Sequence, residues 1–415
     1  MARWWIGPSR SPGDPAGPEP EPEPRAVLEP GPRSEPEPEA GPDAEPEPRP
    51  GPESEFPTAA ELVTTLTGLD GTEQEIVRVP IPADRHFEMK ANALLGRLGP
   101  EHPETLAAFR DYARVLARVK ERREEARERL TDLLLVQSRV LGYVHEDTLT
   151  TADDLAGLLR TTGQLGRAEE LWRSVWNSRA ELLGQDHPDT LRSAIRLAEV
   201  LEDLRRVPEA TALRRDVWER RRRALGPDHP DTLSAANGHA ISLIHAGRFE
   251  EAERELRDLI GRSEQRGERD DDILLEARGN LGAALCRLGR LQEAMEVLRA
   301  VLLELERAKG PDHDDTLAVH NNFAAVLHGM GRYSDAAAVL REVETRTSRL
   351  HGETHPDTLR ARDNLANVLT DTGERQEAAR LLRACLDGYR RAYGPGHPLV
   401  RSATERLDRL RDHPA

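Results

Sequence analysis

Residues 355–378 read HPDTLRARDNLANVLTDTGERQEA, and residues 313–336, 42 positions earlier, read HDDTLAVHNNFAAVLHGMGRYSDA. The pattern recurs, with departures, over most of the chain from residue 100 onward, which makes about seven copies. A fixed period of this length is typical of proteins in which each copy is one supersecondary unit. A threonine near the start of the unit keeps the register, at Thr148, Thr190, Thr232, Thr316 and Thr358.

Three columns of small or apolar residues share this 42-residue register. Several columns in one register are not expected by chance, so the repeat decides the fold class. One column is Ala126, Ala168, Ala210, Ala252, Ala294, Ala336 and Ala378; another is Ala156, Ala198, Ala240, Gly282, Ala324 and Ala366; the last is Leu159, Leu201, Leu243, Leu285, Leu327 and Leu369.

Each unit predicts a helical hairpin. The motif LAxxL places apolar residues three and four apart, on one face of a first helix. A glycine then marks the end of that helix, at 163, 247, 289, 331 and 373, where a positive φ is expected. The motif GRxxEA opens a second helix, whose alanine should meet the small residue of the first. Such a hairpin cannot cover its own apolar face, so stacked copies should form a continuous core.

With the spacing of 12 residues between the paired small positions, such as Ala156 and Ala168, the pattern resembles the tetratricopeptide repeat. The motifs GPDHPDTL, NLAxxL and GRxxEA resemble its kinesin-light-chain-type form, which has 42 residues in place of the usual period of about 34. The resemblance covers residues 100–412. It implies an all-α, right-handed superhelical solenoid of about seven hairpins that binds a protein or peptide in its concave groove, as an adaptor or scaffold. Such repeats also occur in bacteria, and the excess of arginine over lysine favours a GC-rich genome such as an actinobacterial one.

Outside the repeats we expect two further regions. Residues 1–57 hold 17 of the 30 prolines, with 13 acidic residues against 5 arginines, which predicts a disordered acidic tail. Residues 58–99 form a junction or an N-terminal cap, with a short helix in TAAELVTTLTGL, an edge strand in EIVRVPIP and a helix in HFEMKANALLGRLG. The stretch ending at residue 412 should be a C-terminal capping helix. In the third repeat Arg205 replaces the turn glycine, and we expect that turn to be bent or less rigid.

Several functions are disfavoured. The net charge of −16 argues against nucleic acid or an anionic membrane as the partner. The two cysteines form no CxxC motif and are expected in the core of a cytoplasmic protein. No nucleophile elbow, HExxH motif or phosphate-binding loop occurs, so we expect neither an enzyme nor a cofactor.

Seven histidines recur beside carboxylates, but equivalent atoms of packed repeats lie too far apart to share one metal ion. We expect them to cap helices and pack between repeats, and in the motif DHPD we expect the acidic residue before the histidine to be the N-cap. These histidines are His102, His145, His187, His229, His313, His355 and His397.

A polar column in the first helices is the strongest functional signal. Asn280, Asn322 and Asn364 are 42 residues apart, and an amide can both donate to and accept from the backbone of a bound peptide. Repeats about 10 Å apart would match every third residue of an extended chain at ~3.3 Å per residue. We hypothesise that these asparagines grip a peptide and that cations two positions earlier select an acidic ligand. The alternative is that the asparagines only pack against neighbouring helices. The cations are Arg278, His320 and Arg362.

The column breaks earlier in the chain, at Gly238, Arg196 and Asp154, so binding should concentrate in the last three repeats. One second helix, RRDVWERRRRAL at 214–225, is strongly basic. It is either a solvated face with acidic partners one turn away or a dock for an acidic segment such as the chain's own tail. A second candidate function is a peptide- or ligand-responsive regulatory sensor that acts through a separate effector.

Overall fold

The computed structural model describes residues 60–62, 79–81, 83–266 and 272–412, which divide after His86 into two units. In the first unit, β1 (Ala60–Leu62) pairs antiparallel with β2 (Val79–Ile81), with Ala60 opposite Ile81. The strand β2 lies in the stretch predicted as an edge strand. The strand β1 lies where a helix was predicted, and that prediction was wrong at these three residues. The stretch around them is rich in threonine, which favours extended backbone. The predicted tail, residues 1–57, lies outside the described residues.

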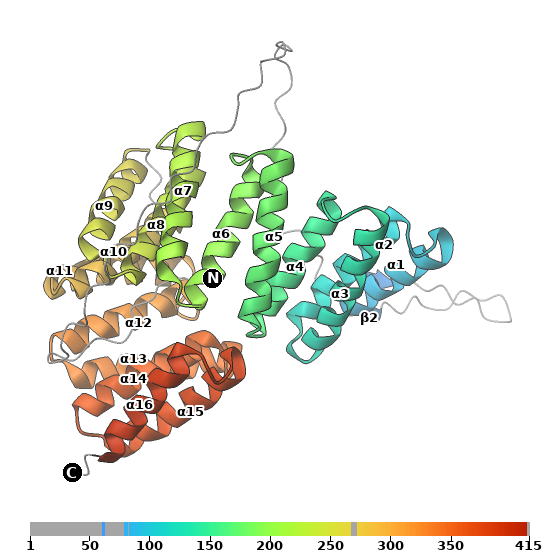
Figure 1. Ribbon diagram of the computed structural model, residues 1–415. Helices are drawn as coiled ribbons and strands as arrows, with labels where there is room; N and C mark the ends of the chain where they lie inside the picture. The colour runs from blue at the N-terminus through green and yellow to red at the C-terminus, as the bar shows by residue number, and fades with distance from the viewer. Residues whose placement is uncertain (1–59, 63–78, 82, 267–271, 413–415) are drawn as a thin grey trace, which may run out of the picture. The chain divides into compact units, whose positions relative to one another are not determined.

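The second unit is a solenoid of helical hairpins preceded by α1 (Ala83–Leu98), which begins before the division. Figure 1 shows the hairpins following one another along the chain. A single helix, α16 (Pro398–Asp412), ends the array where a capping helix was predicted. The hairpins are α2 (Pro103–Arg118) with α3 (Arg123–Val140), α4 (Glu146–Thr161) with α5 (Leu165–Leu183), α6 (Pro188–Asp203) with α7 (Val207–Leu225), α8 (Pro230–His245) with α9 (Phe249–Gln265), α10 (Asp272–Arg287) with α11 (Leu291–Ala308), α12 (Asp314–Gly329) with α13 (Tyr333–His351), and α14 (Pro356–Asp371) with α15 (Arg375–Tyr393).

The repeating columns form the contact between the two helices of each hairpin. All seven alanines of the second-helix column have no exposed surface, and the small residues of the first-helix column are buried beside them. The approach is close at Gly282, where an added Cβ would lie 2.5 Å from Leu298 Cδ2. Because each hairpin also packs on the next, the buried strip is continuous, and its largest cluster runs from α8 to α12. The predicted all-α solenoid is therefore confirmed for residues 83–266 and 272–412.

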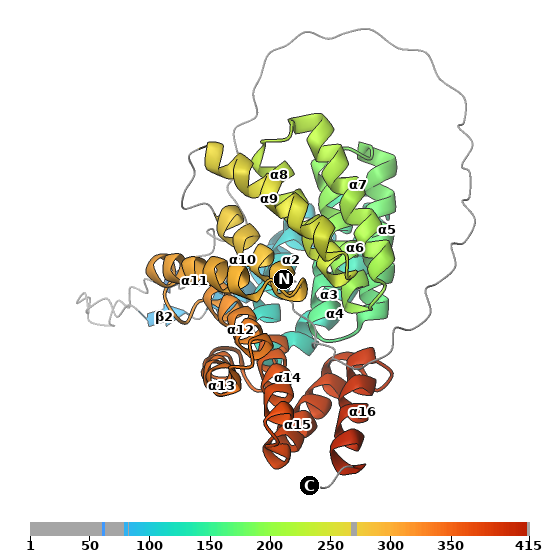
Figure 2. The same cartoon turned by 90° about the vertical axis from the view of Figure 1, so that its left-hand side faces the viewer.

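The helices form two layers. The first helices of successive repeats touch one another directly, from α8 to α10, from α10 to α12 and from α12 to α14. Figure 2 shows α10, α12 and α14 in sequence, with α11 and α13 to one side of them. This arrangement places the first helices in one layer of the array, with equivalent residues of successive repeats in line.

The turns between the paired helices follow one geometry, including the turn that lacks glycine. Arg205 has φ 62°, whereas Gly247 has φ 76°. The closing bond also persists, because Arg206 N donates to Leu201 O at 2.8 Å, as Arg248 N does to Leu243 O at 2.9 Å. The expectation of a bent or less rigid turn in the third repeat was therefore wrong. Arginine adopts the left-handed conformation here at a cost of about 1–2 kcal/mol relative to a right-handed residue.

Candidate binding surface

The predicted asparagine column lies on the first helices α10, α12 and α14, and two of its members are bonded to the preceding repeat. Asn280 Nδ2 donates to Asn237 Oδ1 at 2.9 Å, and Asn364 Nδ2 donates to Asn321 Oδ1 at 3.0 Å. Each of these bonds joins residues 43 positions apart. The asparagines thus form a ladder between neighbouring first helices, and the ladder uses both the predicted position and the one before it. For Asn280 and Asn364 this geometry favours the packing alternative.

Asn322 differs from its two neighbours in the column. Its side chain has no exposed surface, and neither its amide nitrogen nor its amide oxygen has a hydrogen-bond partner among the described residues. The reason lies 43 positions earlier, where the ladder would need a side-chain acceptor and the chain has Gly279. An unsatisfied buried amide group costs on the order of 1–3 kcal/mol. Asn322 is therefore the position where this surface holds unused hydrogen-bonding capacity.

The predicted cations do not lie beside the asparagines. Arg278 contacts Glu264 at 3.0 Å and Glu304 at 3.1 Å, which are residues of the second helices α9 and α11. Residues two positions apart on a helix are rotated by about 200° about its axis. The cations therefore lie on the opposite side of the helix from the asparagines, toward the second helices. The expectation that these cations flank the asparagine column was therefore wrong.

The other two cations point the same way. His320 Nε2 lies 3.5 Å from Glu306 Oε1 of α11, and its Nδ1 lies 3.0 Å from the carbonyl of Thr316. Arg362 is mostly buried, and its Nε donates to Glu344 Oε1 of α13 at 2.7 Å. These contacts connect each first helix to neighbouring second helices. Neither cation is therefore positioned beside the asparagines to select an acidic ligand.

The break in the column at Gly238 has a packing cause. An added Cβ at Gly238 would lie 2.8 Å from Arg214 Nη1, so the buried guanidinium occupies the space of an asparagine side chain. Arg214 Nε donates to Glu202 Oε1 at 2.8 Å, and both side chains are less than one tenth exposed. Burial alone would raise the pKa of Glu202, but the charge of Arg214 holds that pKa below its ordinary value. At Gly238 the space of an asparagine side chain is thus filled by the buried ion pair of Arg214 with Glu202.

The corresponding surface in the second and third repeats is charged. Asp154 lies 3.7 Å from Arg114 Nε, and burial raises the pKa of its carboxyl to about 6 although Arg114 and Arg110 act in the opposite direction. Arg196 is exposed and lies 3.4 Å from Glu199. At the column position itself, asparagine therefore occurs in the fifth, sixth and seventh repeats, although the ladder also includes Asn237 of the fourth repeat.

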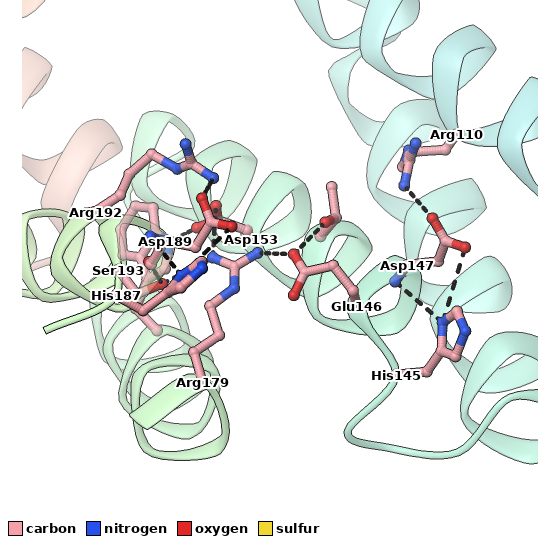
Figure 3. A network of polar contacts seen from close by, with 12 residues as sticks. Arg110, His145, Glu146, Asp147, Asp153, Arg179, His187, Asp189, Arg192 and Ser193 are labelled. Atoms are coloured by element: carbon pink, nitrogen blue, oxygen red, sulfur yellow. Dashed lines mark hydrogen bonds and ion pairs between the residues drawn. The ribbon is translucent and has the colours of Figure 1, made fainter. Parts of the chain in front are cut away.

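Polar groups between repeats also serve packing alone, as Figure 3 shows around Arg179 of α5. This side chain is 1% exposed, and it donates to Ser193 Oγ of α6 at 2.8 Å and to Glu146 Oε1 of α4 at 2.7 Å.

The basic stretch of α7 carries its own acidic partners. Arg215 pairs with Glu219 and Arg220 pairs with Asp216, each one turn away. These pairs support the solvated-face interpretation of the basic helix.

The recurring histidines cap helices. In each of the seven, Nδ1 accepts a hydrogen bond from the backbone N–H two residues later, as at Asp147, which donates to His145 at 3.2 Å (Figure 3). The N-cap is thus the histidine itself, and not the acidic residue before it as predicted.

The described residues contain no group of three or more histidine, cysteine or carboxylate side chains that could hold a metal ion. None of the described helices combines the length and hydropathy needed to cross a lipid bilayer.

Solved structures resemble the array. Nearly identical kinesin light chain TPR-like repeats from Podosopora anserina are 25% identical, with a TM-score of 0.41, and the match covers 49% of this chain and 95% of that one. A tetratricopeptide repeat protein from Parabacteroides merdae is 13% identical, with a TM-score of 0.48 and coverage of 79% and 98%. The quorum sensor NprR from B. thuringiensis is 12% identical, with a TM-score of 0.53 and coverage of 74% and 82%, which shows a shared fold.

Family profiles of the tetratricopeptide repeat also match the sequence, over more than half of the chain. No curated protein matches the sequence. Two profiles described as tetratricopeptide repeat match it, one at residues 189–265 and 273–347 and the other at 148–189 and 358–399. The matches cover the helical hairpins from α4 to α15 and follow the period seen in the sequence. The chain belongs to the tetratricopeptide repeat family, whose members are protein-interaction modules.

Proposed function

We propose that this array binds an extended peptide segment of a protein partner on the surface formed by α10, α12 and α14, and that Asn322 supplies the central contact. The observation that carries the proposal is the unused amide of Asn322, which is buried opposite Gly279 and has no described partner. A peptide group placed beside Asn322 would accept from its nitrogen and donate to its oxygen.

The glycine makes this contact possible. A peptide backbone needs room to approach an amide within about 3 Å, and Gly279 presents no side chain in the place where the other rungs of the ladder have an asparagine. The contact would replace an unsatisfied group by two hydrogen bonds, so binding would recover a cost that the free protein bears. This gain is independent of the peptide's side chains.

The chemistry of the partner follows from the rest of the surface. The cations of the sixth and seventh repeats are engaged by glutamates of the second helices, so selection of acidic side chains is not part of the proposal. The neighbouring rungs, Asn280 and Asn364, are closed by bonds within the protein. We therefore propose a backbone contact at one rung, rather than a grip at every rung.

The test uses peptides of 12 residues selected from a random library on the full chain. Their affinity is measured by calorimetry for the wild type, for Asn322→Leu and for Arg196→Leu, a matched variant at the same position of the third repeat. We expect Asn322→Leu to weaken binding at least tenfold, which corresponds to about 1.4 kcal/mol, and Arg196→Leu to bind as the wild type does. Equal binding by Asn322→Leu and the wild type would refute the proposal.

A further inference from the structure

Two turns that are far apart in the sequence touch each other in the structure. His397, the N-cap of α16, lies with its Nε2 2.9 Å from the carbonyl oxygen of Asp203, the last residue of α6. The two residues are 194 positions apart. The contact therefore joins the start of the C-terminal helix to the third repeat and spans the repeats between them.

The geometry fixes the state of the histidine ring. Nδ1 accepts from the N–H of Leu399 at 3.3 Å, which caps α16, so Nε2 carries the proton and donates to the Asp203 carbonyl. The ring is 9% exposed and stacks on Tyr393, with 4.6 Å between ring centroids. One neutral tautomer thus satisfies both nitrogens, and the contact is a positioned hydrogen bond rather than a chance approach.

The third repeat contributes the turn that lacks glycine to the same place. Arg205, the arginine in the left-handed conformation, is partly buried, and Tyr389, Asp203 and Tyr393 lie close enough to influence its pKa. Tyr389 and Tyr393 lie with ring centroids 6.2 Å apart at the end of α15. The residue that departs from the glycine consensus therefore lies two positions after the carbonyl that accepts from His397.

We propose that these two turns form an intramolecular clasp, defined as Asp203 and Arg205 against Tyr389, Tyr393 and His397, which holds the third to seventh repeats bent and closes the surface around Asn322. Within the span of the clasp, the first helices α8, α10, α12 and α14 touch in succession, and bending the array toward them would hold them together. Asn322, in the middle of this series, is fully buried. A partner would therefore bind to the open form, and the clasp would set how much of that form is present.

Two variants break the clasp and one serves as the control. His397→Ala removes the bond to Asp203 together with one helix cap, and His187→Ala removes a cap of the same kind from α6. Arg205→Gly removes the charged side chain near the tyrosines and restores the residue found in the other turns, so the hairpin is expected to fold. All variants are made in the full chain with Cys286→Ala and Cys385→Ala.

The first readout is the distance between spin labels at Arg215→Cys in α7 and Glu405→Cys in α16, both exposed positions. We expect a narrow distribution for the parent and for His187→Ala, and a shift to longer distances for His397→Ala and Arg205→Gly. An unchanged distribution in both of the latter variants would overturn the clasp, as would an equal shift in His187→Ala.

The second readout is the rate at which a thiol reagent modifies Asn322→Cys. We expect several-fold faster modification with His397→Ala or Arg205→Gly than with His187→Ala or the parent. Opening without faster modification would overturn the statement that the clasp closes the surface. This consequence for binding rests on the proposed function, but neither readout needs a peptide, so a failure of peptide binding leaves both results interpretable.

Discussion

Replacing Asn322 by leucine should stabilise the protein, although the residue is a buried member of a repeating column. Leucine has the same branched heavy-atom skeleton as asparagine but no polar atoms. Because neither amide atom of Asn322 has a described partner, the change removes an unpaired polar group at the cost of no hydrogen bond. An unpaired buried group costs about 1–3 kcal/mol, and we expect the free energy of unfolding to rise by a similar amount.

The same substitution at Asn280 should have the opposite sign. Asn280→Leu removes the 2.9 Å bond to Asn237, whose side chain is 4% exposed, and leaves a buried acceptor unpaired. The expected loss is about 1–3 kcal/mol. The two variants place the same residue at equivalent positions of adjacent repeats, so differences in helix propensity and side-chain volume largely cancel between them.

Urea unfolding followed by circular dichroism measures both changes, and comparison is valid where the variants keep the slope of the wild type. A loss of more than about 1 kcal/mol in Asn322→Leu, similar to that in Asn280→Leu, would mean that Asn322 makes a structural hydrogen bond. The packing alternative would then hold for the whole column, and the unused amide would not exist.

Four further substitutions test the packing and electrostatics. Arg214→Met leaves its buried glutamate partner without a counter-charge, and it should lower the free energy of unfolding by about 3–5 kcal/mol in urea. Asp154 has a pKa raised to about 6 by burial, so its carboxyl favours the folded state at low pH and loses that contribution as the pH rises from about 4 to 6. Asp154→Asn should therefore stabilise the protein by on the order of 1–3 kcal/mol at pH 8 and by nothing near pH 4; equal effects at both pH values would contradict the assignment. Gly282→Ala places a Cβ 2.5 Å from Leu298 and should lower the thermal midpoint through a loss of about 1–3 kcal/mol, whereas Gly261→Ala, with open space at its Cβ, should raise it through a gain of about 0.5–1 kcal/mol.

The hairpins were predictable because a period of 42 residues repeats every buried contact. Ala294, for example, is fully buried for the same reason as Ala336, so one correct assignment applies to all copies. The turn at Arg205 was not predictable in this way. Residue preference argues against an arginine with positive φ, and the surrounding hairpin overrides that preference.

The candidate surface was predictable only in part. The period of 42 residues identified Asn280, Asn322 and Asn364. The hydrogen bonds between repeats join residues 43 positions apart, so the bonding partners of Asn280 and Asn364 lie one position outside the column. Reading that offset would have singled out Gly279 from the sequence alone. The cations were misplaced because a spacing of two residues was treated as one helical face.

The clasp could not be inferred from sequence. The meeting of Asp203 and His397 depends on small rotations that accumulate from repeat to repeat, and a change of a few degrees in each would separate them. Arg205 was visible as a departure from the glycine consensus, but nothing in the sequence connected it with Tyr389 and Tyr393. Long-range contacts of this kind are a property of the assembled array.

The most direct test of the account is a crystal structure of the full chain with a library-selected peptide. We predict an extended segment on α10, α12 and α14, with one peptide group hydrogen-bonded to both amide atoms of Asn322 beside Gly279. A peptide bound on the second helices, or one bound on the first helices while Asn322 stays unpaired, would contradict the central claim that the unused amide marks the binding surface.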